Sequence, residues 1–462
     1  MSVRSGILCH MPDAPPAPAR VLGPLSATSI VIGAIIGVGI FFNPSSMAKL
    51  TQSGPLLLLA WGIGGLISLC GAMVFAELGG KYNGNGAQYQ VLRDAFGPMP
   101  AFLYVFCNAT AIQAGAIGVI AEVCVQNLFQ AIGRVEPTGY LLVGSATFLT
   151  AAVACANILG VRWGSSIQNA TVILKIIAIL VIAIVAALYG KMAINTPPPP
   201  ESGPRMTPAL AVMAALVPAM FAYGGWQHAL WISGEVKNPQ KNLPRAIIVG
   251  VLIVVAVYML ANWSYLKLLG VGAIADSTSV GANAVGAAFP SAGKRIIAGV
   301  IAISALGVLN AQLLSGPRLI YGMAIDGRFF PAFSRLSPAR GTPVAAIILM
   351  SVIAMALIWL AGADGVNKMG TGAVFIDAIF FILTGVALFI LRRRGGDWPF
   401  KMPGYPVLPI FFILGETGAL IGMYTNPKTV NVAWIGVAWI VAAALLYLAK
   451  FKRTASSSSI SA

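Results

Sequence analysis

Two short segments of this 462-residue chain carry paired glycines inside long apolar runs: residues 33–41 (GAIIGVGIF) and residues 221–226 (FAYGGW). Paired glycines weaken a helix, and an unwound turn frees backbone N–H and C=O groups that can bind a polar ligand. At membrane depth such groups are tolerated only where they line a cavity. Close helix packing is the alternative explanation for any single glycine. Two doublets at matching positions instead predict two broken helices that form one binding site.

Four ionisable side chains lie deep inside apolar runs and are candidates for ion coupling. Lys175 lies well inside the run 166–190, where snorkelling to an interface is the alternative reading. Glu122, Asp377 and Glu416 could each form a structural pair or carry a proton. We expect no acidic side chain beside the two glycine segments, which favours a neutral ligand over a cationic one.

Three further polar residues have simpler interpretations. Glu77 and Glu235 fall at predicted helix ends, where we expect them to contact Lys or Arg side chains of loops. His228 is the one histidine outside the N-terminal tail, and we interpret it as a polar helix position rather than a metal ligand or proton switch.

Several enzyme and pump signatures are absent from the sequence. The Gly-Lys pairs that end at Lys81, Lys191 and Lys294 are not followed by Ser or Thr, as a phosphate-binding loop requires. With two histidines there is no HExxH motif, and no GxSxG elbow occurs. The sequence therefore predicts neither an enzyme nor a primary pump, and no cofactor.

The composition indicates which elements position these residues. Hydrophobic residues make up 58% of the chain and charged residues only 9%, with a mean hydropathy of +0.86. This is too little polar material to coat a water-soluble globule. Since a helix needs about 20 apolar residues to cross a bilayer, we predict an all-α membrane protein with twelve transmembrane helices at 26–48, 55–79, 99–128, 139–160, 166–190, 208–235, 243–269, 295–322, 343–362, 371–391, 407–425 and 430–449.

The net charge of +16 reflects membrane insertion rather than nucleic-acid binding. With a cytoplasmic N-terminus, most Lys and Arg side chains, including those of 392–394 and 450–453, fall on the inner side, in line with the positive-inside rule. We therefore predict a multi-pass protein of the inner (plasma) membrane with both termini in the cytoplasm, in contact with lipid and with no nucleic-acid partner. Four of the five cysteines lie in predicted spans, so no disulfide framework is expected. No apolar stretch typical of a cleavable signal precedes the first span.

The chain divides at a run of four prolines, 197–200, which cannot be helical. Five predicted spans lie on either side of this run, and because five is odd, the two groups have opposite orientations in the membrane. The predicted organisation is a tail (1–24), a first repeat (25–194), an external linker (195–205), a second repeat (206–394), two further helices (395–453) and a second tail (454–462).

An ordered set of motifs resembles the amino acid–polyamine–organocation transporters, and among them the L-type (neutral) amino acid transporters. Besides the two glycine segments, the motifs lie at 76–79 (AELG), 157–175, 235–244, 316–318 and 403–406 (PGYP). Val38 stands where the family usually has Ser, and Ile325 replaces an Arg. The resemblance implies the LeuT-type fold, with two inverted five-helix repeats and two extra helices.

The resemblance also implies roles for individual residues. An amino acid carboxylate suits free N–H groups at a helix N-terminus, and its ammonium suits carbonyls at a helix C-terminus. By resemblance, backbone N–H groups of Ile36, Gly37, Val38 and Gly39 bind the carboxylate, and carbonyls of Phe221, Ala222 and Gly224 bind the ammonium. The Phe221 ring is the expected gate, and Trp226 and Gln227 are expected at the side-chain pocket. Lys175 replaces a sodium ion and ties the first helix to the fifth, and Tyr265 supplies a hydroxyl near the site.

Together these residues predict a sodium-independent secondary transporter that moves amino acids, with neutral L-amino acids favoured, by alternating access as an exchanger or facilitator. A proton-coupled symporter of cationic amino acids or polyamines is the alternative, and a channel is the alternative from another class. The sequence leaves open which amino acid is carried and whether an accessory subunit exists.

Overall fold

The computed structural model of the chain describes residues 20 and 22–452, apart from 85, 160–163, 191–206, 291, 338–339, 363–364, 426 and 428. Most of the first predicted tail, the whole second tail and the whole predicted linker lie outside the described residues. Within the described residues the chain is helical and has no β-strand; one isolated bridge joins Leu22 to Val236. Twelve helical segments there are long and apolar enough to cross a membrane, which confirms the predicted all-α membrane architecture.

The first five spans run from α1 to α8. Their helices are α1 (Pro24–Ile35) and α2 (Gly39–Thr51), α3 (Gly54–Lys81), the short α4 (Ala87–Phe96), then α5 (Pro98–Cys107), the π-helical turn η1 (Asn108–Ile112) and α6 (Gln113–Ala131), α7 (Gly139–Ile158) and α8 (Gly164–Tyr189).

The remaining seven spans run from α9 to the C-terminal turn. Their helices are α9 (Pro208–Tyr223), α10 (His228–Trp231), the 3₁₀ turn η2 (Ser233–Glu235), α11 (Pro239–Ala275), the short α12 (Val280–Ala288), α13 (Ala292–Ile325), the 3₁₀ turn η3 (Pro331–Ser334), α14 (Val344–Ala361), α15 (Gly365–Arg393), α16 (Val407–Thr425), α17 (Val430–Leu446) and η5 (Tyr447–Phe451).

The predicted spans and the observed helices differ mainly at their ends. Helix α11 is the largest case, because it begins at Pro239 and continues to Ala275 beyond the predicted end at residue 269. Gly270 has non-helical dihedral angles (φ 74°, ψ 166°) inside it. The predicted boundary therefore coincides with a real kink, after which the helix resumes.

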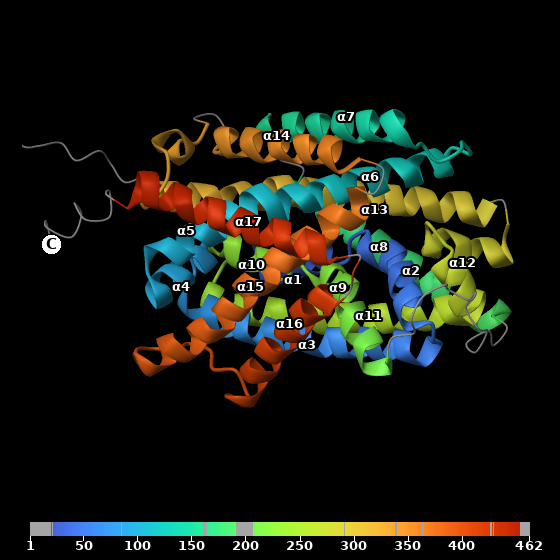
Figure 1. Cartoon of the computed structure of the whole chain (residues 1–462), viewed down its shortest axis with the longest axis horizontal. Helices are drawn as coiled ribbons and strands as arrows, with labels where there is room; N and C mark the ends of the chain where they lie inside the picture. Colours follow the sequence, from blue (N-terminus) through green and yellow to red (C-terminus); the bar gives the residue numbers. More distant parts are fainter. Residues whose placement is uncertain are drawn as a thin grey trace, which may run out of the picture.

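Helices at corresponding places of the two predicted repeats pack against each other: α2 against α9, α3 against α11, α6 against α13, and α7 against α14. Figure 1 shows α7 and α14 side by side along the upper edge, with α1, α9 and α10 near the centre of the bundle. Small residues allow these close contacts. Between α3 and α11, a Cβ on Gly65 would lie 2.9 Å from Val255, and one on Gly79 would lie 2.8 Å from Leu243.

Ion pairs gather at the end of the bundle where α1 begins and α17 ends, which we call the terminal end. The Glu77 carboxylate is fully buried and accepts two hydrogen bonds from the Arg392 guanidinium, at 2.5 and 2.6 Å. Glu235 pairs with Arg318 at 3.3 Å. The predicted contacts of Glu77 and Glu235 with basic side chains are thus confirmed, although both arginines lie in long helices.

A second group at the terminal end joins the short helix α4 to the end of α13. The Tyr89 hydroxyl donates to Asp326 at 2.7 Å, and Arg93 pairs with the same carboxylate at 2.9 Å. Burial and the hydrogen bond to Asp326 raise the pKa of Tyr89, so the hydroxyl keeps the proton that it donates. Together with the Glu77–Arg392 pair between α3 and α15, these contacts link four helices at the terminal end.

Candidate functional site

The first span is interrupted where the sequence predicts. Helix α1 ends at Ile35 and α2 begins at Gly39. The Ile36 N–H donates to the Ile32 carbonyl and the Gly37 N–H to the Ile35 carbonyl, each at 2.7 Å. No backbone partner is present for the N–H groups of Val38 and Gly39 among the described residues. The first turn of α2 therefore presents free donors at the positive end of a helix dipole.

The sixth span is interrupted after Tyr223, the last residue of α9. Gly224 has ψ 151° and Gly225 has φ 130°, a dihedral angle that side-chain-bearing residues rarely adopt. The chain resumes as a helix at His228. Both predicted breaks are thus confirmed, and the second leaves the last carbonyls of α9 at the negative end of a helix dipole.

The two breaks touch each other. A Cβ on Gly225 would lie 2.6 Å from the Ala34 carbonyl oxygen, and a Cβ on Gly39 would lie 2.9 Å from the Ala222 Cα. Glycine is needed at both places because the backbones approach too closely for a side chain. Gly39 has no positive φ, so its requirement comes from this contact rather than from its own dihedral angles.

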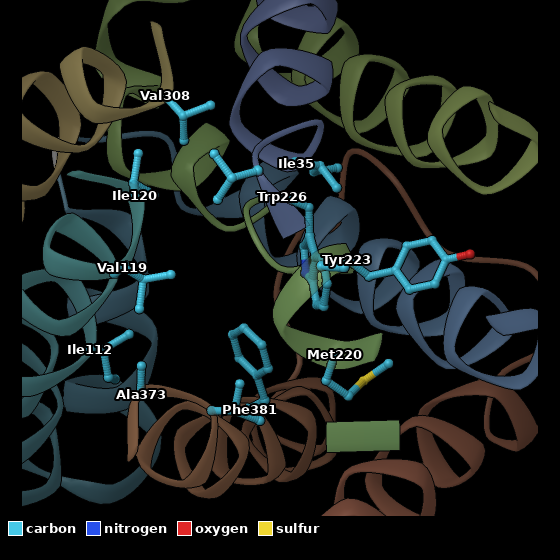
Figure 2. Packing of buried hydrophobic residues seen from close by; sticks show 14 of the residues in the cluster. Ile35, Ile112, Val119, Ile120, Met220, Tyr223, Trp226, Val308, Ala373 and Phe381 are labelled. Carbon is cyan, nitrogen blue, oxygen red and sulfur yellow. The ribbon is translucent and has the colours of Figure 1, made fainter. Parts of the chain in front are cut away.

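Both breaks line one cavity in the middle of the bundle, with a volume of about 80 Å³. Figure 2 shows its apolar wall, with Ile112, Ile120 and Val308 across from Ile35 and Met220, and with Phe381 at the base. The polar groups around it are backbone of the two breaks and six side chains: Gln113, Gln227, His228, Gln312, Asp377 and Glu416.

Seven of the predicted substrate-binding residues line this cavity. They are Gly37, Val38, Gly39, Phe221, Ala222, Gly224 and Gln227. Ile36 and Trp226 are buried beside it instead. The N–H groups of Ile36 and Gly37 already donate within the break, so in this conformation Val38 and Gly39 are the free donors of the predicted set. The Trp226 ring stacks on Phe381, with centroids 5.1 Å apart.

The expectation that no acidic side chain lies beside the breaks is wrong. Asp377 and Glu416 both line the cavity, and the Gln227 Nε2 lies 3.4 Å from the Asp377 Oδ2. The two acids are 150 and 189 residues from Gln227 along the chain (377 − 227 and 416 − 227). Packing of α15 and α16 against α9 brings them to the site, and sequence proximity to the glycines does not reveal that packing.

Lys175 lies on α8, is 0% exposed, and donates from Nζ to the Gly33 carbonyl at 3.4 Å. It therefore does not snorkel to an interface, and it joins the fifth span to the helix just before the first break. It does not line the cavity. Glu122 is also buried, at 2% exposure, and lies outside the cavity lining.

A tyrosine that the sequence analysis missed connects the two breaks. The Tyr258 hydroxyl lies 2.9 Å from the Ile35 carbonyl and 3.2 Å from the Ala222 carbonyl. Tyr265, the predicted hydroxyl donor, is buried without a hydrogen-bond partner for its hydroxyl among the described residues. The two tyrosines lie two helical turns apart on α11. The sequence therefore identified the helix that supplies the hydroxyl, but the tyrosine that reaches the breaks lies two turns earlier.

His228 also contributes to the cavity lining, and its Nδ1 lies 2.7 Å from the Ser315 Oγ. This agrees with a polar helix position. Gln113 and Gln312 were missed because a single glutamine in an apolar run carries no spacing signal. All three side chains add hydrogen-bonding capacity around the apolar wall.

A second, larger cavity of about 490 Å³ lies toward the end of the bundle opposite the terminal end. Phe221 and Val374 line both cavities. The Phe221 ring also packs edge-on against Phe42, with centroids 6.0 Å apart. The predicted gate residue is therefore located at the boundary between the two cavities.

Comparisons of the sequence with known proteins identify amino acid transporters as relatives. The family model described as amino acid permease matches residues 22–456. The chain is 32% identical over 417 residues to the serine/threonine exchanger SteT of Bacillus subtilis (strain 168), covering 86% of this chain and 91% of that protein. It is 30% identical over 404 residues to the human b(0,+)-type amino acid transporter 1, covering 86% and 80%. It is 28% identical over 450 residues to the mouse large neutral amino acids transporter small subunit 2, covering 93% and 80%.

Proposed function

The chain belongs to the amino acid permease family, and from that premise we propose that it is a sodium-independent secondary transporter of amino acids, with neutral L-amino acids as substrates. It works by alternating access, as an exchanger or facilitator. The observation that carries the proposal is the central cavity, where free N–H groups at the start of α2 lie near the last residues of α9.

The ends of the two helices suit the two charges of an amino acid. The carboxylate binds the N–H groups of Val38 and Gly39 at the positive end of α2. The ammonium binds carbonyls at the C-terminal end of α9, namely those of Phe221, Ala222 and Gly224. Because these are backbone groups, they recognise the part that all amino acids share and leave selectivity to the side chains around the cavity.

The named relatives support exchange and neutral substrates. One is called a serine/threonine exchanger and another a large neutral amino acids transporter small subunit. The apolar wall formed by Ile112, Ile120 and Val308 suits a neutral side chain.

Alternating access requires one end to be closed while the other is open. The ion pairs of Glu77 and Asp326 link helices at the terminal end, and the larger cavity lies toward the other end. Both observations support a terminal end that is closed in this conformation. We propose that the terminal end is cytoplasmic in the plasma membrane, as the distribution of basic residues indicates. The larger cavity then opens to the outside, and Phe221 separates it from the substrate.

We propose that the helices form two inverted repeats, 25–194 and 206–394, followed by two further helices. The pairwise packing of corresponding helices and the matching positions of the two breaks support this division.

Sodium independence rests on Lys175. Its ammonium donates to the Gly33 carbonyl just before the first break, which supports the proposal that it takes the place of a sodium ion. Two like charges about 4 Å apart repel by roughly 4 kcal/mol at an effective dielectric constant near 20. A sodium ion beside this ammonium is therefore unfavourable.

The test is counterflow with the purified full-length chain in liposomes loaded with a panel of unlabelled amino acids. We expect saturable exchange of labelled neutral amino acids, equal with external sodium or choline. Ohmic current without counterflow would identify a channel, and sodium-stimulated uptake would contradict the assignment of Lys175.

A second candidate function is proton-coupled symport of cationic amino acids or polyamines. The observation in its favour is that Asp377 and Glu416 line the cavity. Uptake that an inward proton gradient drives, in the absence of internal substrate, would favour this candidate over exchange.

A further inference from the structure

A surface patch at the terminal end combines aromatic rings with positive charge. It is formed by the segment that follows α13, residues 328–335, and by the C-terminal turn η5 with Lys452, and we call it the basic aromatic patch. The centroid of the Phe451 ring lies 5.9 Å from that of Phe329 and 5.2 Å from that of Phe330. These two contacts place the segment after α13 directly against the last turn that the structure describes.

The basic aromatic patch has an excess of positive charge. It contains no Asp or Glu and four cations: Arg328, Arg335, Lys450 and Lys452. None of the four forms an ion pair within the described part of the chain. Asp326, the acid nearest in the sequence, is already paired with Arg93. An anion that binds at the patch would therefore meet cations that no carboxylate neutralises.

Arg328 is the most enclosed of these cations. Its side chain is partly buried, whereas the other three are exposed. Its Nη1 atom is buried and has no hydrogen-bond partner among the described residues. A guanidinium group presents several donors in a planar fork that matches the oxygens of a phosphate. The Arg328 guanidinium therefore has unused donors for an acceptor from outside the chain.

The aromatic rings give the basic aromatic patch an apolar surface beside these charges. Phe330 is 38% exposed, and the Lys450 Nζ lies 5.4 Å from the centre of its ring. Phe329 and Phe451 are buried, at 9% and 8% exposure, and pack against Phe330. An exposed ring next to an ammonium group suits a ligand that has both an apolar part and an anionic part.

The basic aromatic patch also lies at the depth of lipid headgroups. It follows the end of α13 at Ile325, and η5 completes the last membrane-spanning segment at Phe451. Figure 1 shows the end of α17 beside the beginning of α14, the next span after α13. Basic side chains at the ends of spans attract anionic headgroups, and aromatic rings concentrate at the same depth.

We propose that the basic aromatic patch binds an anionic phospholipid, whose phosphate contacts Arg328 and Lys450 and whose acyl chain lies against Phe330. The charge of the patch selects an anionic lipid over a zwitterionic one, and the exposed ring selects a lipid over a soluble phosphate. None of these residues lines the substrate cavity. The site is therefore independent of which amino acid the protein carries.

The experiment measures thermal unfolding of the purified full-length chain in detergent micelles to which phosphatidylglycerol or phosphatidylcholine is added. A ligand that binds the folded state raises the midpoint of unfolding as its concentration increases. We expect phosphatidylglycerol to raise the midpoint and phosphatidylcholine at the same concentration to leave it unchanged. Glycerol phosphate, which has the phosphate but no acyl chain, is the third ligand, and we expect it to have no effect.

The double variant Arg328→Gln, Lys450→Gln removes both proposed contacts with the phosphate. We expect the phosphatidylglycerol concentration that gives half of the stabilisation to rise by about tenfold or more, because each basic side chain near an anionic lipid strengthens binding. The double variant Arg335→Gln, Lys452→Gln changes only exposed side chains and therefore tests the patch even if the first variant does not fold. We expect a smaller rise in the same direction.

The matched control is the double variant Lys241→Gln, Arg245→Gln. Both side chains are exposed on α11 near its beginning, where Lys237 bonds to Leu22 at the terminal end, and neither forms an ion pair among the described residues. The control thus loses the same charge from the same end of the bundle. We expect it to respond to phosphatidylglycerol as the wild type does.

Three results would overturn the lipid site. The first is equal stabilisation of the wild type by phosphatidylglycerol and phosphatidylcholine, which would mean that charge does not select the lipid. The second is an equal loss of the response in the control and in both patch variants, which would assign the effect to total charge. The third is stabilisation by glycerol phosphate at the same concentrations, which would identify a site for free phosphate.

Discussion

The two helix breaks lie at corresponding places in the first and sixth spans, but their backbones are used differently. In the first break, Ile36 and Gly37 donate their N–H groups to nearby carbonyls of α1, and the free donors are those of the next helical turn. In the second break, Gly225 adopts a positive φ and the Gln227 side chain accepts its N–H group. The first break therefore offers donors at the start of a helix, and the second offers acceptors at the end of one.

This difference shows how a symmetric scaffold can bind an asymmetric ligand. A zwitterion needs donors on one side and acceptors on the other, and two helix ends of opposite polarity provide them without any charged side chain. The side chains that touch the breaks divide in the same way. Lys175 donates to the Gly33 carbonyl just before the first break, Phe221 belongs to the second, and the Tyr258 hydroxyl reaches a carbonyl of each.

The largest effect is expected where the two breaks cross. Gly39→Val would place a Cβ about 3 Å from Ala222 and force the two backbones apart. Such overpacking costs roughly 1–3 kcal/mol, and we expect counterflow to fall by about 100-fold. Gly37 also lines the cavity, but in Gly37→Ala the Cβ would meet only the Val308 side chain and the Ile35 carbonyl at ordinary contact distances of 3.6–3.7 Å, so we expect a smaller loss than in Gly39→Val.

Counterflow and ligand-induced thermal stabilisation measure these two variants in the same preparation. Val38→Ser, which keeps the backbone N–H group, is expected to behave as the wild type. Substrate affinity at the wild-type level in Gly39→Val would mean that the crossing of the breaks does not shape the site.

Removing the Lys175 ammonium tests the first break alone. Lys175→Ala leaves the Gly33 carbonyl without its donor, and an unpaired buried group costs roughly 1–3 kcal/mol. We expect exchange to fall by about 30-fold, with sodium or choline outside alike. Exchange at the wild-type rate in Lys175→Ala would contradict a role for the ammonium, and recovery with sodium but not with choline would contradict the expected independence from the external cation.

The Tyr258 hydroxyl tests the coupling between the breaks. It has one proton and two carbonyls within reach, one from each broken helix. Tyr258→Phe removes this link at a cost of about 1 kcal/mol, and we expect turnover to fall by about fivefold. Tyr265→Phe is the matched control on the same helix, since its hydroxyl has no partner among the described residues. Equal effects of the two variants would contradict a special role for Tyr258.

The features that the sequence predicts correctly are those that depend on the residues close together in the chain. Twelve spans and both breaks follow from runs of apolar residues and from glycines close together in the chain, and the structure confirms them. Seven of the nine predicted substrate-binding positions line the cavity for the same reason, because they lie in or next to the glycine segments.

What the sequence does not predict depends on which helix faces meet. Asp377 and Tyr258 reach the breaks through the packing of α15 and α11, and their own neighbours in the sequence are ordinary apolar residues. Tyr258 and Tyr265 differ by two full turns, so helical periodicity gives them the same face and cannot select the right depth. Depth along a helix and contacts between distant helices are properties of the folded bundle.

The smallest effect is expected from the second break alone, at Phe221. Its ring lies between the substrate cavity and the larger cavity, and its backbone carbonyl is a predicted ammonium ligand. Phe221→Ala keeps the carbonyl and removes the ring that closes the passage. We therefore expect turnover to fall about threefold while affinity changes less than about twofold, since gating residues affect the conformational step more than binding.

Phe42→Ala is the control. It removes the partner ring from the larger cavity only, and we expect a weaker effect in the same direction. If exchange rates measured in vesicles are unchanged in Phe221→Ala, the ring is a packing element and the second break contributes only its backbone.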